Sequence, residues 1–152
     1  MNKAEKAMAC FKNGYSCSIA VFSTYAPAFG VDEKTAARIA GAFGGGMARM
    51  GETCGAVTGA FMVLGLLNHS KPGDGRDEIK ERLYASVHEF AGAFTAKNKS
   101  IKCRELLGCE LDTPEGSRIF KEKDLKNTKC MKFVQDAAEI LDIMIKNQTE
   151  NN

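Results

Sequence analysis

The sequence predicts an all-α fold, a single-domain helical bundle of about six to seven helices, from three observations. Apolar residues recur at three- and four-residue steps over most of the chain. No segment shows the sustained two-residue alternation that is typical of a strand. Several periodic stretches follow a Ser, Thr or Asp that can cap a helix, and end at a Gly or Pro. With 152 residues, the chain is long enough to bury one core without disulfides.

Four helices are expected in the first half of the chain. Asn13-Gly14 stops the first, and Pro27 ends the second. Asp32 caps the third, since its carboxylate can accept from the backbone N–H groups of a first helical turn. A run of three glycines precedes the fourth, which Thr53 opens. The expected helices are residues 4–12, 17–25, 33–43 and 53–68.

The second half begins with a Pro/Gly loop over residues 71–75 and then continues as helix. Its longest helix is amphipathic, with apolar residues on one face. The last helix has a similar apolar face, and the polar residues after it are expected to fray. The single domain therefore spans residues 1–147, followed by a frayed tail at 148–152. The expected helices are residues 77–97, 100–108 and 128–146, with another helical turn or two over residues 114–123.

Composition and charge exclude several classes of protein. A net charge of +2 argues against a nucleic-acid partner. The N-terminal residues lack the apolar region of a signal peptide, and the longest apolar run, residues 56–67, is too short to span a membrane. We therefore expect a cytoplasmic protein whose thiols stay reduced. In that setting the six cysteines indicate metal or redox chemistry rather than structural disulfides.

Four of the six cysteines share a local setting. Each follows, within three residues, a Ser or Thr that can begin a helix. A thiol in a first helical turn feels the positive end of the helix dipole, which favours the thiolate. Cys10 lies within an apolar helix and Cys109 follows an expected helix end, so both fall outside this pattern. The four are Cys17 after Ser16, Cys54 after Thr53, Cys103 after Ser100 and Cys130 after Thr128.

A glycine pair after Cys54 lies on one face of the expected fourth helix. Gly55 and Gly59 are four residues apart, so a second helix can approach closely there. Gly55 also leaves room for a cluster or for a partner sulfur. The same face offers a surface for a homodimer. Phosphate binding by the preceding glycine run is disfavoured because no strand precedes it and no Lys-Ser/Thr pair follows it.

Five separate motifs carry a family resemblance that covers nearly the whole chain. The chain resembles the bacterial and archaeal family of redox-active proteins named for a cysteine, a CGAxxG motif and two further cysteines. The resemblance implies redox activity, names no substrate, and implies that Cys17, Cys54, Cys103 and Cys130 are the functional cysteines. The motifs are residues 14–17, 43–47, 54–60, 103–108 and Cys130.

The leading hypothesis is that these four cysteines converge and bind an iron–sulfur cluster, with Gly55 beside it. The protein would then pass electrons to a redox partner protein that the sequence does not identify. At least 26 residues separate neighbouring motif cysteines, so no C-x-x-C pair exists and the whole fold must assemble the site. Helix N-termini would offset the negative charge of a thiolate-bound cluster.

Three alternatives remain open. In a metal-free oxidoreductase, Cys54 would act as a low-pKa nucleophile and a second cysteine would resolve the mixed disulfide. A zinc site formed by the four cysteines would instead stabilise an interaction module. Buried, inert thiols are the last alternative. Outside the cysteines, Arg104 is read as a surface ion-pair former and the charged run at 121–126 as a solvated surface, and no role is assigned to the histidines.

Overall fold

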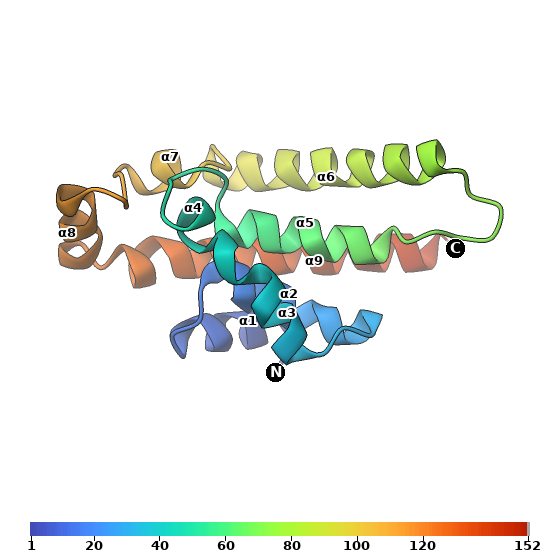
Figure 1. Cartoon of the computed structure of the whole chain (residues 1–152), viewed down its shortest axis with the longest axis horizontal. Coiled ribbons are helices and arrows are strands. Elements are labelled where there is room, and N and C mark those ends of the chain that lie inside the picture. The colour runs from blue at the N-terminus through green and yellow to red at the C-terminus, as the bar shows by residue number, and fades with distance from the viewer. Residues whose placement is uncertain (152) are drawn as a thin grey trace.

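The fold is an elongated helical bundle in which three helices run along the long axis (Figure 1). These are α5 (Gly55–Leu67), α6 (Arg76–Asn98) and α9 (Met131–Glu150). The computed structural model describes residues 1–151. In that range seven helices have eight or more residues and no strand is present, which confirms the all-α prediction. The remaining helices are α1 (Lys3–Lys12), α2 (Cys17–Tyr25), α3 (Glu33–Ala40), α4 (Gly44–Met47), α7 (Cys103–Leu107) and α8 (Pro114–Glu122).

Short polar side chains cap the N-termini of three of these helices, as the sequence predicts. Ser16 Oγ accepts the Ile19 N–H at 3.4 Å at the start of α2. Asp32 Oδ1 accepts the Thr35 N–H at 2.9 Å before α3, and Thr113 caps α8. Each cap satisfies a backbone donor that has no partner inside the helix, so these starts are encoded locally.

The contact between α2 and α5 depends on Gly59. A Cβ at this position would lie 2.8 Å from the carbonyl oxygen of Ser18 and 3.2 Å from Val21 Cβ. Only a residue without a side chain lets the two backbones approach so closely. The prediction of close helix packing at Gly59 is therefore confirmed, and within one chain this glycine face is covered by α2.

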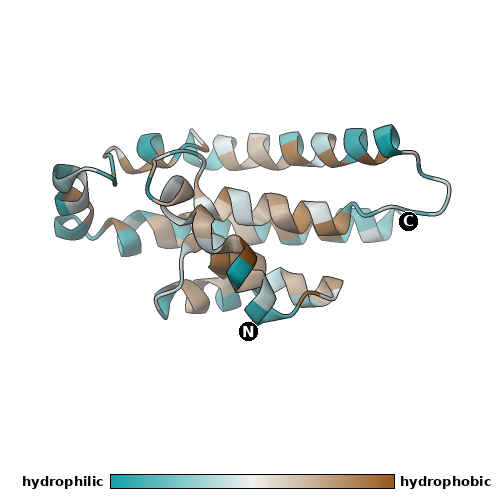
Figure 2. Ribbon diagram, in the orientation of Figure 1, coloured by the Kyte–Doolittle hydropathy of each residue, from teal (hydrophilic) through white to brown (hydrophobic). Residues whose placement is uncertain are grey.

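The core is shared by α1, α2, α3, α5, α6 and α9, and a row of aromatic rings runs across the part between α5, α6 and α9. Phe90 contacts Phe61 edge-on at 6.0 Å between ring centroids and stacks on Phe94 at 6.1 Å. Phe94 in turn lies 6.2 Å from Phe133 of α9. Such pairs stabilise a core beyond the area that they bury. Figure 2 shows the hydrophobic colour concentrated along α5 and the hydrophilic colour along α6 and α8.

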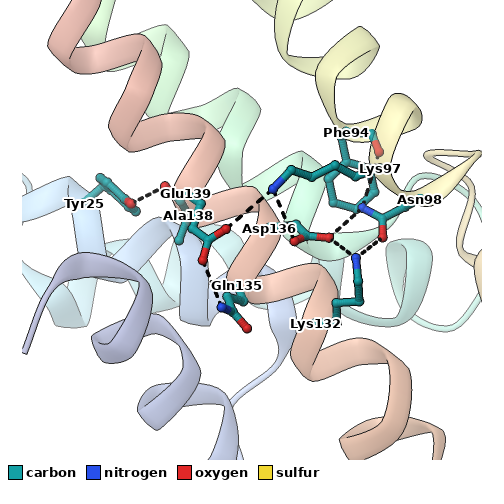
Figure 3. A network of polar contacts seen from close by, with 9 residues as sticks. All are labelled: Tyr25, Phe94, Lys97, Asn98, Lys132, Gln135, Asp136, Ala138 and Glu139. Carbon is teal, nitrogen blue, oxygen red and sulfur yellow. Dashed lines mark hydrogen bonds and ion pairs between the residues drawn. The ribbon is translucent and has the colours of Figure 1, made fainter.

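A buried carboxylate joins the end of α6 to α9 (Figure 3). Asp136 is 6% exposed, and its side chain accepts from Asn98 at 3.0 Å and pairs with Lys97 at 3.7 Å. Lys132, one turn earlier on α9, also pairs with Asp136 and donates to Asn98 at 3.0 Å. A buried charge needs such partners to offset its lost hydration. The network fixes α6 where the chain leaves it toward Cys103.

The C-terminal helix is longer than the sequence predicts. α9 continues to Glu150 instead of ending at residue 146, and Thr149 Oγ1 donates to the carbonyl oxygens of Ile145 and Lys146. The expected frayed tail thus largely belongs to the helix, while Asn152 lies outside the described residues. Within residues 1–151, no helix combines the length and the hydropathy that crossing a bilayer requires.

Candidate functional site

Cys17, Cys54, Cys103 and Cys130 line a single cavity of about 200 Å³. Cys54 and Cys103 are buried, whereas Cys17 and Cys130 are half-buried. The rest of the wall is mostly apolar. Its aromatic and leucine side chains include Phe11, Phe120, Phe133, Leu106, Leu107 and Leu111.

The four cysteines come from four different elements. Cys17 is the first residue of α2, Cys54 immediately precedes α5, and Cys103 is the first residue of α7. Cys130 ends a π-helical turn, η3 (Lys126–Cys130), that leads directly into α9. Figure 1 shows the start of α5, α7 and the start of α9 at the same end of the bundle.

The expected hydroxyl caps hold only at Cys17. Thr53 instead pairs with Lys102 in an isolated antiparallel bridge. Ser100 Oγ accepts the Lys102 N–H, and Thr128 Oγ1 donates to the carbonyl oxygen of Asp124. Three of the cysteines still lie at helix starts, but Cys130 does not, because η3 and α9 form a continuous helical path through it. The prediction of a shared hydroxyl cap is therefore wrong for three of the four positions.

An extended backbone pairing joins the segments that carry Cys54 and Cys103. The Cys54 N–H donates to Ile101 O at 2.8 Å, and the Cys103 N–H donates to Glu52 O at 2.7 Å. Outside this pairing, Arg104 forms an exposed ion pair with Glu52 at 3.0 Å, consistent with its surface reading. The two cysteines are thus held in register by main-chain bonds, although 48 residues separate them.

Gly55 provides the space that the Cys17 sulfur occupies. A Cβ built on Gly55 would overlap Cys17 Sγ and would lie 3.1 Å from both Phe43 O and Ser18 N. The missing side chain therefore lets α5 begin directly against the first turn of α2. The prediction that Gly55 leaves room for a partner sulfur is confirmed.

A left-handed turn reaches the cavity through one residue, Gly45. Residues 45–49, which begin within α4, all have φ between 52° and 70°. Three of them are not glycine, and each such residue costs about 1–2 kcal/mol in this conformation. The turn directs the Gly45 N–H to the sulfur of Cys17. Strained backbone of this kind persists where the surrounding structure fixes it, as at many functional sites.

The thiols of Cys17 and Cys54 are hydrogen-bonded to each other and titrate as a pair. Donation from Cys54 lowers the pKa of Cys17 to about 6, against the opposing effect of burial, and the backbone N–H groups of Gly45, Ser18 and Cys17 lower it further. The hydrogen bond to Cys17 raises the pKa of Cys54 well above its usual range, and burial adds to this. Cys17 is therefore the thiolate of the pair at neutral pH.

The lower pKa of Cys17 is the reverse of the sequence-based expectation, in which Cys54 is the activated, low-pKa nucleophile. The physical reason is the number of donors around each sulfur. Three backbone N–H groups and one thiol stabilise the charge on Cys17. Among backbone groups only the Ala56 N–H lowers the pKa of Cys54. A charged sulfur among mostly apolar side chains needs hydrogen-bond donors, so the proton stays on Cys54.

The other cysteines have raised pKa values. Burial raises the pKa of Cys103 to about 12, and the nearby Cys17 charge acts in the same direction. Burial and Cys17 also raise the pKa of Cys130 to about 12. Cys10 and Cys109 lie outside this cavity, and burial raises their pKa values as well. Of the six thiols, only that of Cys17 is stabilised in its ionised form.

Lys126 is a cavity residue that sequence reasoning missed, because the charged run at 121–126 reads as solvated surface. It is half-buried and lines the cavity, with its Nζ 5.3 Å from the centroid of the Phe11 ring. The available signal was its spacing from Cys130, since residues four apart share a helical face. The sequence offered no means of knowing which face meets the cavity.

The donor chemistry of the cavity suits an iron–sulfur centre, since all four side chains are thiols. The positions of the side chains do not match this chemistry. Within residues 1–151, no three His, Cys, Asp or Glu side chains are grouped so that they could hold a metal ion.

A family model with the description "Putative redox-active protein (C_GCAxxG_C_C)" matches residues 15–144. That description writes the central motif as GCAxxG and not as the CGAxxG of the sequence-based resemblance, and this chain has Cys54-Gly55-Ala56, with the first two letters in the opposite order. No curated protein and no solved structure matches the chain.

Proposed function

This chain belongs to the C_GCAxxG_C_C family of redox-active proteins, and we propose that it is a thiol–disulfide oxidoreductase in which Cys17 is the nucleophile. Cys54 is the resolving cysteine. The observation that carries this proposal is the asymmetric environment of the pair, where donors converge on Cys17 and the proton stays on Cys54. A thiolate is the attacking species in exchange, so a pKa of about 6 supports reaction at neutral pH.

The reaction proceeds in two exchange steps. The Cys17 thiolate attacks one sulfur of a substrate disulfide, forms a mixed disulfide and expels the other sulfur as a thiolate. That thiolate takes the proton of Cys54, and the Cys54 sulfur then attacks Cys17 Sγ. This second exchange expels the remaining substrate sulfur as a thiolate, which takes a proton from solvent. The substrate thus leaves as two thiols and has gained two electrons, while the protein holds a Cys17–Cys54 disulfide. A dithiol reductant reverses this disulfide by the same chemistry.

Disulfide mapping tests the pair assignment. The reduced, metal-free protein is treated with one equivalent of an aromatic disulfide, and its peptides are analysed without reduction. The proposal predicts a Cys17–Cys54 crosslink in the wild type and a stable mixed disulfide on Cys17 in Cys54→Ser. Cys109→Ser, whose sulfur lies outside the cavity, should behave as the wild type. A first adduct on Cys54, or a crosslink that excludes Cys17, would rule the assignment out.

An iron–sulfur centre held by Cys17, Cys54, Cys103 and Cys130 is the second candidate. The observation in its favour is that these four thiols line one cavity. When bound, the cluster would supply one-electron transfer, and the backbone N–H groups around Cys17 would tune its potential through hydrogen bonds to sulfur.

Metal analysis tests this candidate. Anaerobic purification and reconstitution should give stoichiometric iron and sulfide and visible charge-transfer absorbance. A colourless, iron-free product would exclude the cluster. The same assay detects the zinc alternative, which requires one equivalent of zinc and unfolding upon chelation.

A further inference from the structure

One side chain of the cavity wall carries a full positive charge. Lys126 is the only Lys or Arg among the residues that line it, and no Asp or Glu lines it. We propose that Lys126 binds the carboxylate of a small substrate disulfide and orients its sulfurs toward Cys17. This inference rests on the proposed function and specifies its substrate class: a compact molecule with an apolar body and one anionic group.

The local structure leaves the Lys126 ammonium group without an acidic partner. No ion pair of Lys126 occurs within residues 1–151. The nearest acidic residue in sequence, Asp124, accepts from Asn127 Nδ2 through both carboxylate oxygens, at 2.9 and 3.1 Å. The neighbour of Lys126 Nζ is instead the ring of Phe11, which lines the same cavity. An unpaired ammonium group beside apolar walls is a favourable site for an anion.

The π-helical turn accounts for the position of this charge. Lys126 begins η3 and Cys130 ends it, and both side chains line the cavity. Turns of this type are rare and occur frequently at functional sites. Here the turn presents a cation and a thiol to the same cavity.

Lys126 is not among the groups that lower the pKa of Cys17. The groups that stabilise the Cys17 thiolate are Cys54 and the backbone N–H groups of Gly45, Ser18 and Cys17. Lys126 is thus available to a ligand. The aromatic and leucine walls suit an apolar body, and a cavity of about 200 Å³ admits a small molecule rather than a protein segment.

A matched pair of alkylating reagents tests the charge directly. Iodoacetate and iodoacetamide are similar in size, and in both the Cys17 thiolate attacks the methylene carbon and displaces iodide, but only iodoacetate is anionic. The rate constants at Cys17 are measured by peptide mass spectrometry on the reduced, metal-free full chain. Their ratio cancels changes in thiolate fraction. It should fall about fivefold to tenfold in Lys126→Gln, as expected for loss of one nearby charge.

Two variants serve as controls. Lys126→Arg keeps the charge and should retain the wild-type ratio within about twofold. Lys123→Gln removes an exposed charge three residues away, outside the cavity lining, and should do the same. If the rate ratio is unchanged in Lys126→Gln while Cys17 is still alkylated rapidly by iodoacetamide, the role of Lys126 is overturned and the proposed function stands. Slow alkylation of wild-type Cys17 by iodoacetamide at neutral pH rejects the proposed function, and this inference with it.

Discussion

The sulfur of Cys17 lies where a side chain on Gly55 would have to be. This relationship joins the first motif cysteine to the glycine that follows the second. It also explains why the central motif needs a cysteine followed directly by a glycine. Cys54 supplies a hydrogen bond to the Cys17 sulfur, and Gly55 leaves the space for it.

Gly55→Ala should separate α2 from α5 and disturb the thiol pair. The added methyl group overlaps Cys17 Sγ, so we expect a loss of about 1–3 kcal/mol in unfolding free energy. Alkylation of Cys17 at neutral pH should slow as the sulfur moves away from its donors. Gly65→Ala on the same helix is the control, since a Cβ there meets nothing within 4 Å. It should stabilise the protein by about 0.5–1 kcal/mol through helix propensity. Equal effects of the two variants in urea unfolding would refute the steric argument.

Gly46→Ala tests the left-handed turn. Gly46 has a φ of 68°, and a Cβ there would lie 2.5 Å from Cys103 Cβ and 2.8 Å from Glu52 N. Backbone strain and overlap together should cost about 3 kcal/mol or more. Gly30→Ala isolates the strain, because Gly30 has a φ of 82° with nothing near its Cβ, and should cost about 1 kcal/mol. If chemical denaturation gives both variants the same loss of unfolding free energy, the overlap of the added methyl group with Cys103 and Glu52 is not significant.

The helices and the family could be predicted from the sequence because their signals are local. Asp32, Ser16 and Thr113 cap helices through contacts with residues three positions away. The roles within the cavity could not be predicted in this way. The donors to Cys17 include Cys54 and Gly45, which only the folded chain brings together, and the wall position of Lys126 depends on a π-helical turn without a sequence signature.

Asp136→Ala should destabilise the protein without altering Cys17. The substitution removes the buried carboxylate that joins Lys97, Asn98 and Lys132, so we expect a loss of about 1–3 kcal/mol. Glu139→Ala is the control, since Glu139 pairs with the same Lys97 at 3.5 Å but is only half-buried, with a side chain 42% exposed against 9% for Asp136, and should cost less than about 0.5 kcal/mol. Thermal unfolding measures both. Slower alkylation of Cys17 in Asp136→Ala would mean that the network also shapes the cavity.

The central claim is that Cys17 is a thiolate at neutral pH because Cys54 and backbone N–H groups stabilise it. The most direct test is the pH dependence of iodoacetamide alkylation, resolved for each cysteine by mass spectrometry in the reduced, metal-free protein. Only the deprotonated sulfur reacts, so the rate at Cys17 should rise through a midpoint near pH 6 and level off above it. Cys103 and Cys130 should react slowly until strongly alkaline pH. In Cys54→Ala the midpoint for Cys17 should move upward. A wild-type midpoint near about 8.5, the value of an ordinary thiol, would contradict the account.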